Sequence, residues 1–270
     1  MDVKGQSTAG SSATFDAVST RLSAVFLRIA ISQSIVSSVL EVPQSFDVVR
    51  ERALESHRSG QSGMLDILLD REIIKGLSSK NQLDPLLEAI ALQTAVNAEV
   101  AISAAAIVLS HSTADDAFTE ACQMAIDLEP GEWISELNMK RTVSLKTLKE
   151  KGADMVFTDE LRFYRDGLGG KSVVKRADLL FAHVPIMLHS EIPKEDVSYF
   201  RLSRLKEMDE LRHNIVHEDG LQKVRLKEGT EAALFFHEAA HTALRSLANN
   251  YGFTLEPKVL FKNLTEKGKS

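Results

Sequence analysis

Apolar residues recur every three to four positions along most of the chain, which is the spacing of one face of an α-helix. The first such stretch predicts a long helix over residues 15–40, and Val42 and Pro43 interrupt the pattern after it. The apolar positions that we expect on the inner face of this helix are Val18, Leu22, Val25, Phe26, Ile29 and Ile35.

A second and longer apolar pattern begins at residue 84. Asp84 is favourable as an N-cap and Pro85 is favourable at the first helical position, so we expect the helix to begin there. The pattern runs to a predicted kink at residues 111–113 and then continues to Pro130 and Gly131, which end it. The residues of its second half that we expect to face the core are Phe118, Cys122 and Ile126.

Shorter helical patterns fill most of the remaining chain. Thr230 is the expected N-cap of the last helix, and Gly252 is the expected stop at its C-terminal end. No segment shows the strict alternation of a half-buried strand, so the predicted class is an all-α helical bundle. The expected ranges of the shorter helices are 64–77, 141–151, 173–188, 195–216 and 231–250.

The patterns also suggest how the chain is divided. Residues 1–14 are polar and rich in Ser and Gly, which predicts a disordered lead-in. We expect an additional N-terminal helical region over residues 15–83, interrupted by a flexible joint at 59–63. The main helical bundle is predicted over residues 84–252, and residues 253–270 form a C-terminal tail.

Composition narrows the classes of function. The net charge is -6, so any contact with nucleic acid requires a local basic patch. The single cysteine, Cys122, excludes an internal disulfide and fits a reducing compartment. No apolar run reaches transmembrane length, and residues 1–14 lack the features of a signal peptide. We therefore expect a soluble cytoplasmic protein without a membrane partner.

The segment that carries most chemistry is Arg212-His213-Asn214-Ile215-Val216-His217, at the end of the predicted helix 195–216. A fixed cation and a titratable imidazole suit phosphodiester cleavage, in which a hydroxyl loses a proton and the phosphate gains negative charge. The spacing Arg-x4-His is itself weak, because a second copy occurs at Arg52 and His57. The alternative is structural, with Arg212 paired to a nearby acidic residue and His217 capping the helix end.

The stretch LRHNIVHEDG around Arg212 and His217 resembles the HEPN family of helical domains, whose motif is an arginine, a polar residue and then a histidine (R-x4-6-H). The long Ala-rich helix before it, with His111, Asp115 and Asp116, and the helix that follows the motif are also similar to that family. The resemblance implies a HEPN-like bundle over residues 84–252.

The resemblance also implies a function: metal-independent endoribonuclease activity, with two subunits of a homodimer joining their motifs into one cleft. His217 and Arg212 would be catalytic, and His213 and Asn214 would support them. Such domains serve in toxin–antitoxin pairs, antiviral defence and RNA processing, so the implied partners are RNA and an antitoxin or regulatory protein. We expect no metal and no cofactor. The main alternative is a non-catalytic HEPN-like interaction and dimerisation module. The acidic helper residue is left open among Asp115, Asp116 and Glu120.

The string His237-Glu238-Ala239-Ala240-His241 offers a third function, a zinc hydrolase. Two histidines four residues apart share a helix face and can bind Zn²⁺, with Glu238 as general base. No third ligand is evident, because Leu244 and Leu247 occupy the positions where extended zinc motifs carry Gly and His. The alternative is a core helix in which Leu234, Phe235 and Leu244 are packed and the histidines are partly buried.

Two weaker patterns complete the candidates. Asp209, His213 and His217 share a helical spacing of four, as do His237 and His241, so a bundle metal site is a further alternative if adjacent helices bring the two sets together. The stretch Gly167–Ser172 imitates the end of a phosphate-binding loop but lacks its first glycine, and we interpret it as an ordinary loop. Basic residues near that loop are a possible RNA patch, or else a solvated helix face: Arg162, Arg165, Lys171, Lys175 and Arg176.

Overall fold

The computed structural model describes residues 4–42, 80–137, 144–217 and 224–254, together with Val48, Glu51 and Glu55. Over these residues the chain is helical and contains no strand, which confirms the predicted all-α class. The elements are α1 (Lys4–Glu41), α5 (Lys80–Leu128), the 3₁₀-helix η1 (Pro130–Glu136), α6 (Leu145–Lys151), α7 (Ala153–Asp166), the 3₁₀-helix η2 (Gly167–Gly170), α8 (Val173–His183), α9 (Leu202–His217) and α10 (Leu226–Tyr251).

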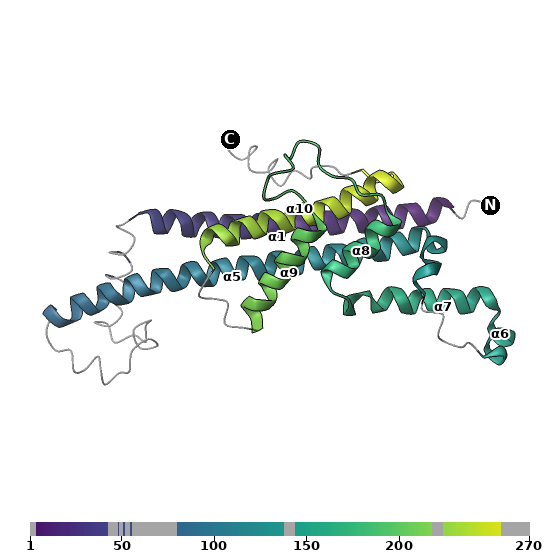
Figure 1. Ribbon diagram of the computed structural model, residues 1–270, viewed down its shortest axis with the longest axis horizontal. Helices are drawn as coiled ribbons and strands as arrows, with labels where there is room; N and C mark the ends of the chain where they lie inside the picture. Colours follow the sequence, from purple (N-terminus) through teal and green to yellow (C-terminus); the bar gives the residue numbers. More distant parts are fainter. Residues whose placement is uncertain are drawn as a thin grey trace.

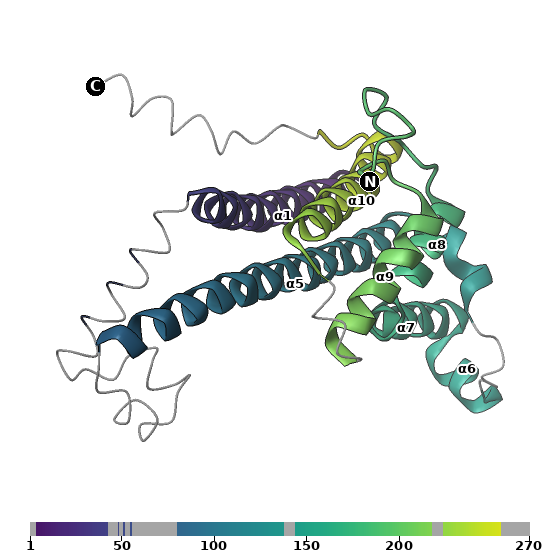
Figure 2. The same cartoon turned by 60° about the vertical axis from the view of Figure 1, so that its left-hand side comes forward.

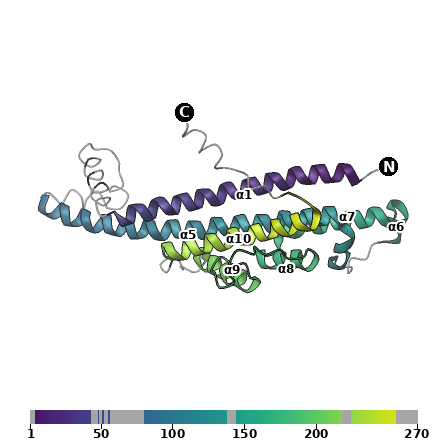
Figure 3. The same cartoon turned by 90° about the horizontal axis from the view of Figure 1, so that it is seen from above.

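The long helices α5 and α10 lie side by side at the centre of the bundle (Figure 1). Helix α1 packs along one side of this pair, and α8 and α9 lie on the other side, as Figure 3 shows. Helices α6 and α7 extend the bundle at one end, and the N-terminal part of α5 projects beyond α10 at the other (Figure 2). None of the helices in the described ranges is long and apolar enough to cross a membrane.

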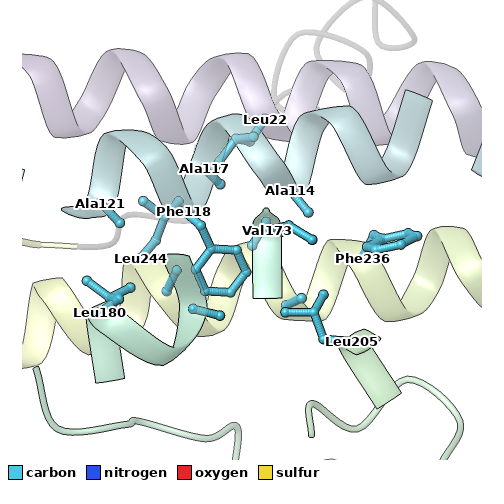
Figure 4. Close-up of a cluster of buried hydrophobic side chains, with 14 of the residues drawn as sticks. Leu22, Ala114, Ala117, Phe118, Ala121, Val173, Leu180, Leu205, Phe236 and Leu244 are labelled. Atoms are coloured by element: carbon cyan, nitrogen blue, oxygen red, sulfur yellow. The ribbon is translucent and has the colours of Figure 1, made fainter. Parts of the chain in front are cut away.

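The core forms where the apolar faces of α5 and α10 meet, and Figure 4 shows part of it. Phe118, Cys122 and Ile126 are buried as their spacing predicts. Helix α1 contributes Leu22 and Phe26 to the same core. The described part of the predicted N-terminal region therefore packs as an integral layer of the bundle rather than as a separate addition.

Several predicted boundaries are wrong. Helix α1 begins at Lys4, so the expected disordered lead-in is helical from that residue. Helix α5 begins at Lys80, which places Asp84 inside the helix instead of at its N-cap. At the predicted kink, residues 111–113, α5 continues as one helix, as the prediction that the pattern runs on requires. Thr113 donates its hydroxyl hydrogen to the carbonyl of Leu109 one turn earlier, and so satisfies its polar group within the helix.

The shorter helices differ from prediction at their ends. Helix α8 ends at His183 rather than at residue 188, because Pro185 follows and disfavours helix before it. Helix α9 begins at Leu202, after turns that occupy much of the segment predicted to start it. Helix α7 was not predicted at all. The predicted helix at 64–77, the joint at 59–63 and the Arg52 copy of the motif lie outside the described residues, as do residues 255–270.

The start of α10 is capped by carboxylates and not by Thr230. The backbone N–H of Arg225 donates to Oε2 of Glu228 at 3.0 Å, and the N–H of Leu226 donates to Oε1 of Glu99 on α5 at 3.1 Å. Thr230 lies one turn inside, where its hydroxyl donates to the carbonyl of Leu226. The predicted C-terminal stop is confirmed, since Gly252 caps the helix with a φ of 73°.

Apolar residues on each of the three long helices are exposed, including Ile35, predicted on the inner face of its helix, and Leu234, packed in the core-helix alternative. Ile35 on α1 is 59% exposed, Leu109 on α5 is 52% exposed and Leu234 on α10 is 50% exposed. Each belongs to an apolar stripe wider than the contact that its helix makes. Periodicity identifies the apolar side of a helix but does not set how much of that side a neighbour covers.

Gly229 on α10 marks the closest approach of the three long helices. A Cβ atom at this position would lie 2.9 Å from Nε2 of Gln33 on α1 and 2.9 Å from the backbone Cα of Ser103 on α5. Because the second neighbour is backbone, α10 and α5 would have to separate to admit a methyl group. A side chain larger than hydrogen is therefore excluded here by the packing of the helices.

We expect Gly229→Ala to lower the free energy of unfolding by about 1–3 kcal/mol, the usual cost of overpacking, even though alanine favours helix. Urea denaturation followed by circular dichroism measures the change. Gly131→Ala is the matched control, because no atom lies within 4 Å of a Cβ at that position. A Gly229→Ala protein as stable as the control variant would contradict the close approach.

Candidate functional site

The residues of the RHNIVH motif occupy the last turns of α9. Arg212 is half-buried, and its Nε is buried without a hydrogen-bond partner in the described part of the chain. His213, Asn214 and His217 are exposed, whereas Ile215 packs into the core. The arginine of the motif is therefore half-buried, whereas its two imidazoles and its amide are exposed to solvent.

One buried histidine ties this end of α9 to α5. Nε2 of His111 lies 2.7 Å from Oδ1 of Asp209, one turn before Arg212. Burial lowers the pKa of His111, and the positive charges of Arg212 and Arg176 lower it further, while Asp209 acts in the opposite direction. Arg212 lies one turn after Asp209 on the same helix, close enough for its positive charge to influence the pKa of His111.

An ion pair lies beside the contact of His111 with Asp209. Arg176 on α8 is 2% exposed and pairs with Asp115 on α5. Its Nη1 also donates to the carbonyl oxygen of Leu168 at 2.8 Å. Burial lowers the pKa of Arg176, and the negative charge of Asp209 acts in the opposite direction. Together the hydrogen bond of His111 with Asp209 and the ion pair of Arg176 with Asp115 join α5, α8 and α9 through polar groups that are partly withdrawn from water.

The imidazoles of His213 and His217 are both exposed to solvent. The ring centroids of His213 and His217 are 4.7 Å apart, as expected for residues one turn apart on a helix. His217 is the last residue of α9. Along a regular helix, Arg212 and His217 are rotated about 140° from each other and separated by about 7.5 Å along the axis. A single chain therefore does not bring this guanidinium and this imidazole together.

The acidic helper candidates differ in their surroundings. Asp115 is engaged by Arg176, and Glu120 pairs with Arg21 on α1. Asp116 is exposed. Asp209, one turn before Arg212, is an acidic residue near the motif whose contact with His111 was not predicted from the sequence. Its place on the same helix indicates that it lies near Arg212, but not that it meets His111.

Two residues of the predicted basic patch pair with carboxylates, whereas Arg162 and Lys175 are exposed. Arg176 is buried with Asp115, and Nε of Arg165 lies 3.0 Å from Oδ1 of Asp127. The ammonium of Lys171 lies over the ring of Tyr164. The adjoining loop is the 3₁₀-helix η2, as an ordinary connection would be, and Ser172 after it caps α8.

The HEAAH string has the geometry of a packed helix. Glu238 is buried and accepts hydrogen bonds from Arg245 and Thr242, so its carboxylate is engaged within α10. The ring of His237 meets the edge of Phe26 on α1, with centroids 5.0 Å apart, and the rings of His237 and His241 are 4.3 Å apart. The general base that a zinc hydrolase requires is therefore held by an arginine.

The two histidine pairs also lie apart. His237 contacts α1, whereas α9 packs on the opposite side of the central pair of helices (Figure 3). Asp209 is held by His111. Across the residues that the structure describes, no group of three or more His, Cys, Asp and Glu side chains could hold a metal. The predicted bundle metal site is not formed.

The buried histidines of α10 predict acid sensitivity. Burial lowers the pKa of His237 and lowers that of His241 to about 3, with Arg245 adding to both effects. In the unfolded chain the pKa of a histidine is about 6.5. Between about pH 6.5 and pH 3 the unfolded state therefore binds more protons, and the stability present above pH 6.5 is lost as the pH falls.

We expect Tm to fall by several degrees between pH 7 and pH 5, since about 1 kcal/mol shifts the Tm of a protein this size by roughly 2–4 °C. Differential scanning calorimetry across this range is the measurement. The variant His237→Gln/His241→Gln should show a flatter dependence. If its dependence matched that of the wild type, the acid sensitivity would have to arise from other groups.

The chain matches no protein-family model, no curated protein and no solved structure. The function of the protein is therefore inferred from the geometry of α9 and its neighbours.

Proposed function

We propose that this protein is a HEPN-like, metal-independent endoribonuclease whose site is completed by a second copy of the chain. The observation that carries the proposal is the joint exposure of His213, Asn214 and His217 on the last turns of α9. An imidazole on an open surface can reach a bulky polymer such as RNA, and the half-buried Arg212 on the same helix supplies a fixed positive charge nearby.

In this proposal the reaction is an internal transesterification of RNA. His217 accepts the proton of the 2′-hydroxyl, whose oxygen forms a bond to phosphorus while the bond from phosphorus to the 5′-oxygen breaks. The leaving 5′-oxygen takes a proton from the partner's His217. Arg212 offsets the charge that develops on the phosphate oxygens. Asn214 and His213 orient the RNA backbone.

A second copy is needed because one helix does not present Arg212 and His217 to the same point. A twofold arrangement of two α9 ends would place the arginine of one chain beside the histidine of the other. The proposed protein is therefore a homodimer, and dilution below its dimerisation constant should remove activity.

The test is incubation of the purified protein with RNA in the presence of EDTA. The proposal expects products that carry a 2′,3′-cyclic phosphate and a 5′-hydroxyl, at a rate unaffected by the chelator. Intact RNA at protein concentrations where sedimentation shows a dimer would reject it.

The second candidate is a non-catalytic HEPN-like interaction module. Two observations favour it: the net charge of -6, and the partial burial of Arg212, whose Nε is buried. In that case the exposed end of α9 would contact a partner protein, such as an antitoxin or regulatory protein. RNA would stay intact in every condition, and alanine variants at His213 and His217 would weaken binding of the partner.

A further inference from the structure

The chain contains two histidine pairs with the same spacing but opposite surroundings. His237 and His241 on α10 are half-buried, with the ring of His237 against Phe26 of α1, and the positive charge of Arg245 lowers the pKa of both. His213 and His217 on α9 are both exposed. Spacing alone makes the two pairs equivalent, so accessibility decides which of them a solute can reach.

The exposed pair has the geometry of a chelating site. Two imidazoles one helical turn apart face the same side of the helix, and their ring centroids here are 4.7 Å apart. Imidazole nitrogen is a preferred ligand of Zn²⁺ and Cu²⁺, and both rings can turn toward one ion. The pair also lies at the C-terminal end of α9, where the carbonyl groups of the last turn favour a cation.

We propose that His213 and His217 bind one divalent transition-metal ion of the zinc and copper class on the surface of α9. Within the described ranges the chain supplies two ligands, since no larger group of ligand side chains occurs there. Water completes the coordination. The site is thus open and reversible, unlike a structural zinc site with four protein ligands.

Occupancy of this site would inhibit the proposed nuclease, and this consequence rests on the proposed function. A metal-bound imidazole has no free nitrogen lone pair with which to accept the 2′-hydroxyl proton. The ion also occupies the surface where the RNA backbone would bind. Zn²⁺ is therefore expected to act as an inhibitor, and a chelator is expected to restore activity.

Metal binding is tested by isothermal titration of the full-length protein, first stripped with EDTA and dialysed, with ZnCl₂. We expect one ion per chain for the wild type. His213→Ala and His217→Ala should each weaken binding by more than the roughly 10–100-fold that loss of an outer-sphere partner costs. His237→Gln is the matched control and should bind like the wild type. Unchanged binding in His213→Ala, or loss of binding in His237→Gln, would overturn the site.

A second measurement avoids dependence on how the buried variant folds. In the wild type, heteronuclear imidazole NMR spectra should show that ZnCl₂ shifts the signals of His213 and His217 and leaves those of His237 and His241 in place. The reverse pattern would overturn the proposal. RNA cleavage assays test the nuclease independently of the metal site. If Zn²⁺ binds at His213 and His217 but the protein cleaves no RNA, the metal site is retained and the nuclease is rejected.

Discussion

We expect His217→Ala to lower the rate of RNA cleavage by about 10²–10⁴-fold, the usual contribution of a general acid–base group. The imidazole is exposed on the last turn of α9, so its removal takes away a proton acceptor without opening a cavity. Helix content and Tm should remain those of the wild type. The measurement is single-turnover cleavage of a labelled RNA in EDTA, with circular dichroism to confirm the fold.

The control for this variant is Ser203→Ala, an exposed position near the other end of the same helix. It should cleave RNA like the wild type. Arg212→Ala is the companion variant, and its loss of activity has to be read against its stability, because Arg212 is half-buried. Chelator-resistant cleavage that survives in both His217→Ala and Arg212→Ala would rule out the assigned site.

Asp115→Asn should be the most destabilising of the single changes considered, with a loss of about 3 kcal/mol in the free energy of unfolding. The substitution removes the negative charge opposite Arg176, a guanidinium that is 2% exposed. An uncompensated buried cation costs more than a lost surface ion pair, which is worth roughly 0–1 kcal/mol. We choose the low end of the range for buried pairs because the Asp115 side chain is 31% exposed.

The neighbouring residue provides the matched control. Asp116 carries the same side chain on the same helix but faces solvent, so Asp116→Asn should change stability by less than about 0.5 kcal/mol. Chemical denaturation of the two variants side by side compares a buried with an exposed charge at adjacent positions. Equal stability of both variants would mean that the pair of Asp115 with Arg176 contributes nothing to the fold.

The helical class could be predicted because it depends on short-range spacing. The apolar positions of α5 and α10, among them Phe118 and Leu244, recur at the helical period and are buried. Helix ends were less predictable. The favourable capping signal at Asp84 was overridden, since α5 begins a turn earlier, and α10 begins with help from Glu99, which is distant in sequence.

The surroundings of the motif could not be predicted for the same reason. Nothing in the residues around Arg212 reveals that His111 would reach Asp209 from another helix 98 positions earlier in the chain. Of the two histidine pairs, the partial burial of His237 and His241 was predicted by the core-helix alternative, whereas the exposure of His213 and His217 was not. The spacing of the two pairs is identical, and only the position of α1 against α10 decides that His237 is half-buried while His217 remains open to solvent.

The contact between Glu99 and the first turn of α10 has a consequence for folding accuracy. Alanines line much of the surface between α5 and α10, and such smooth surfaces fit almost equally well when one helix slides along the other by a turn. The hydrogen bond from the Leu226 N–H to Glu99 and the close approach of Gly229 to Ser103 depend on the present register of α5 and α10. Together these two contacts favour one register of α5 against α10. Replacing both should therefore give a mixture of registers, with unchanged helix content and broadened NMR signals.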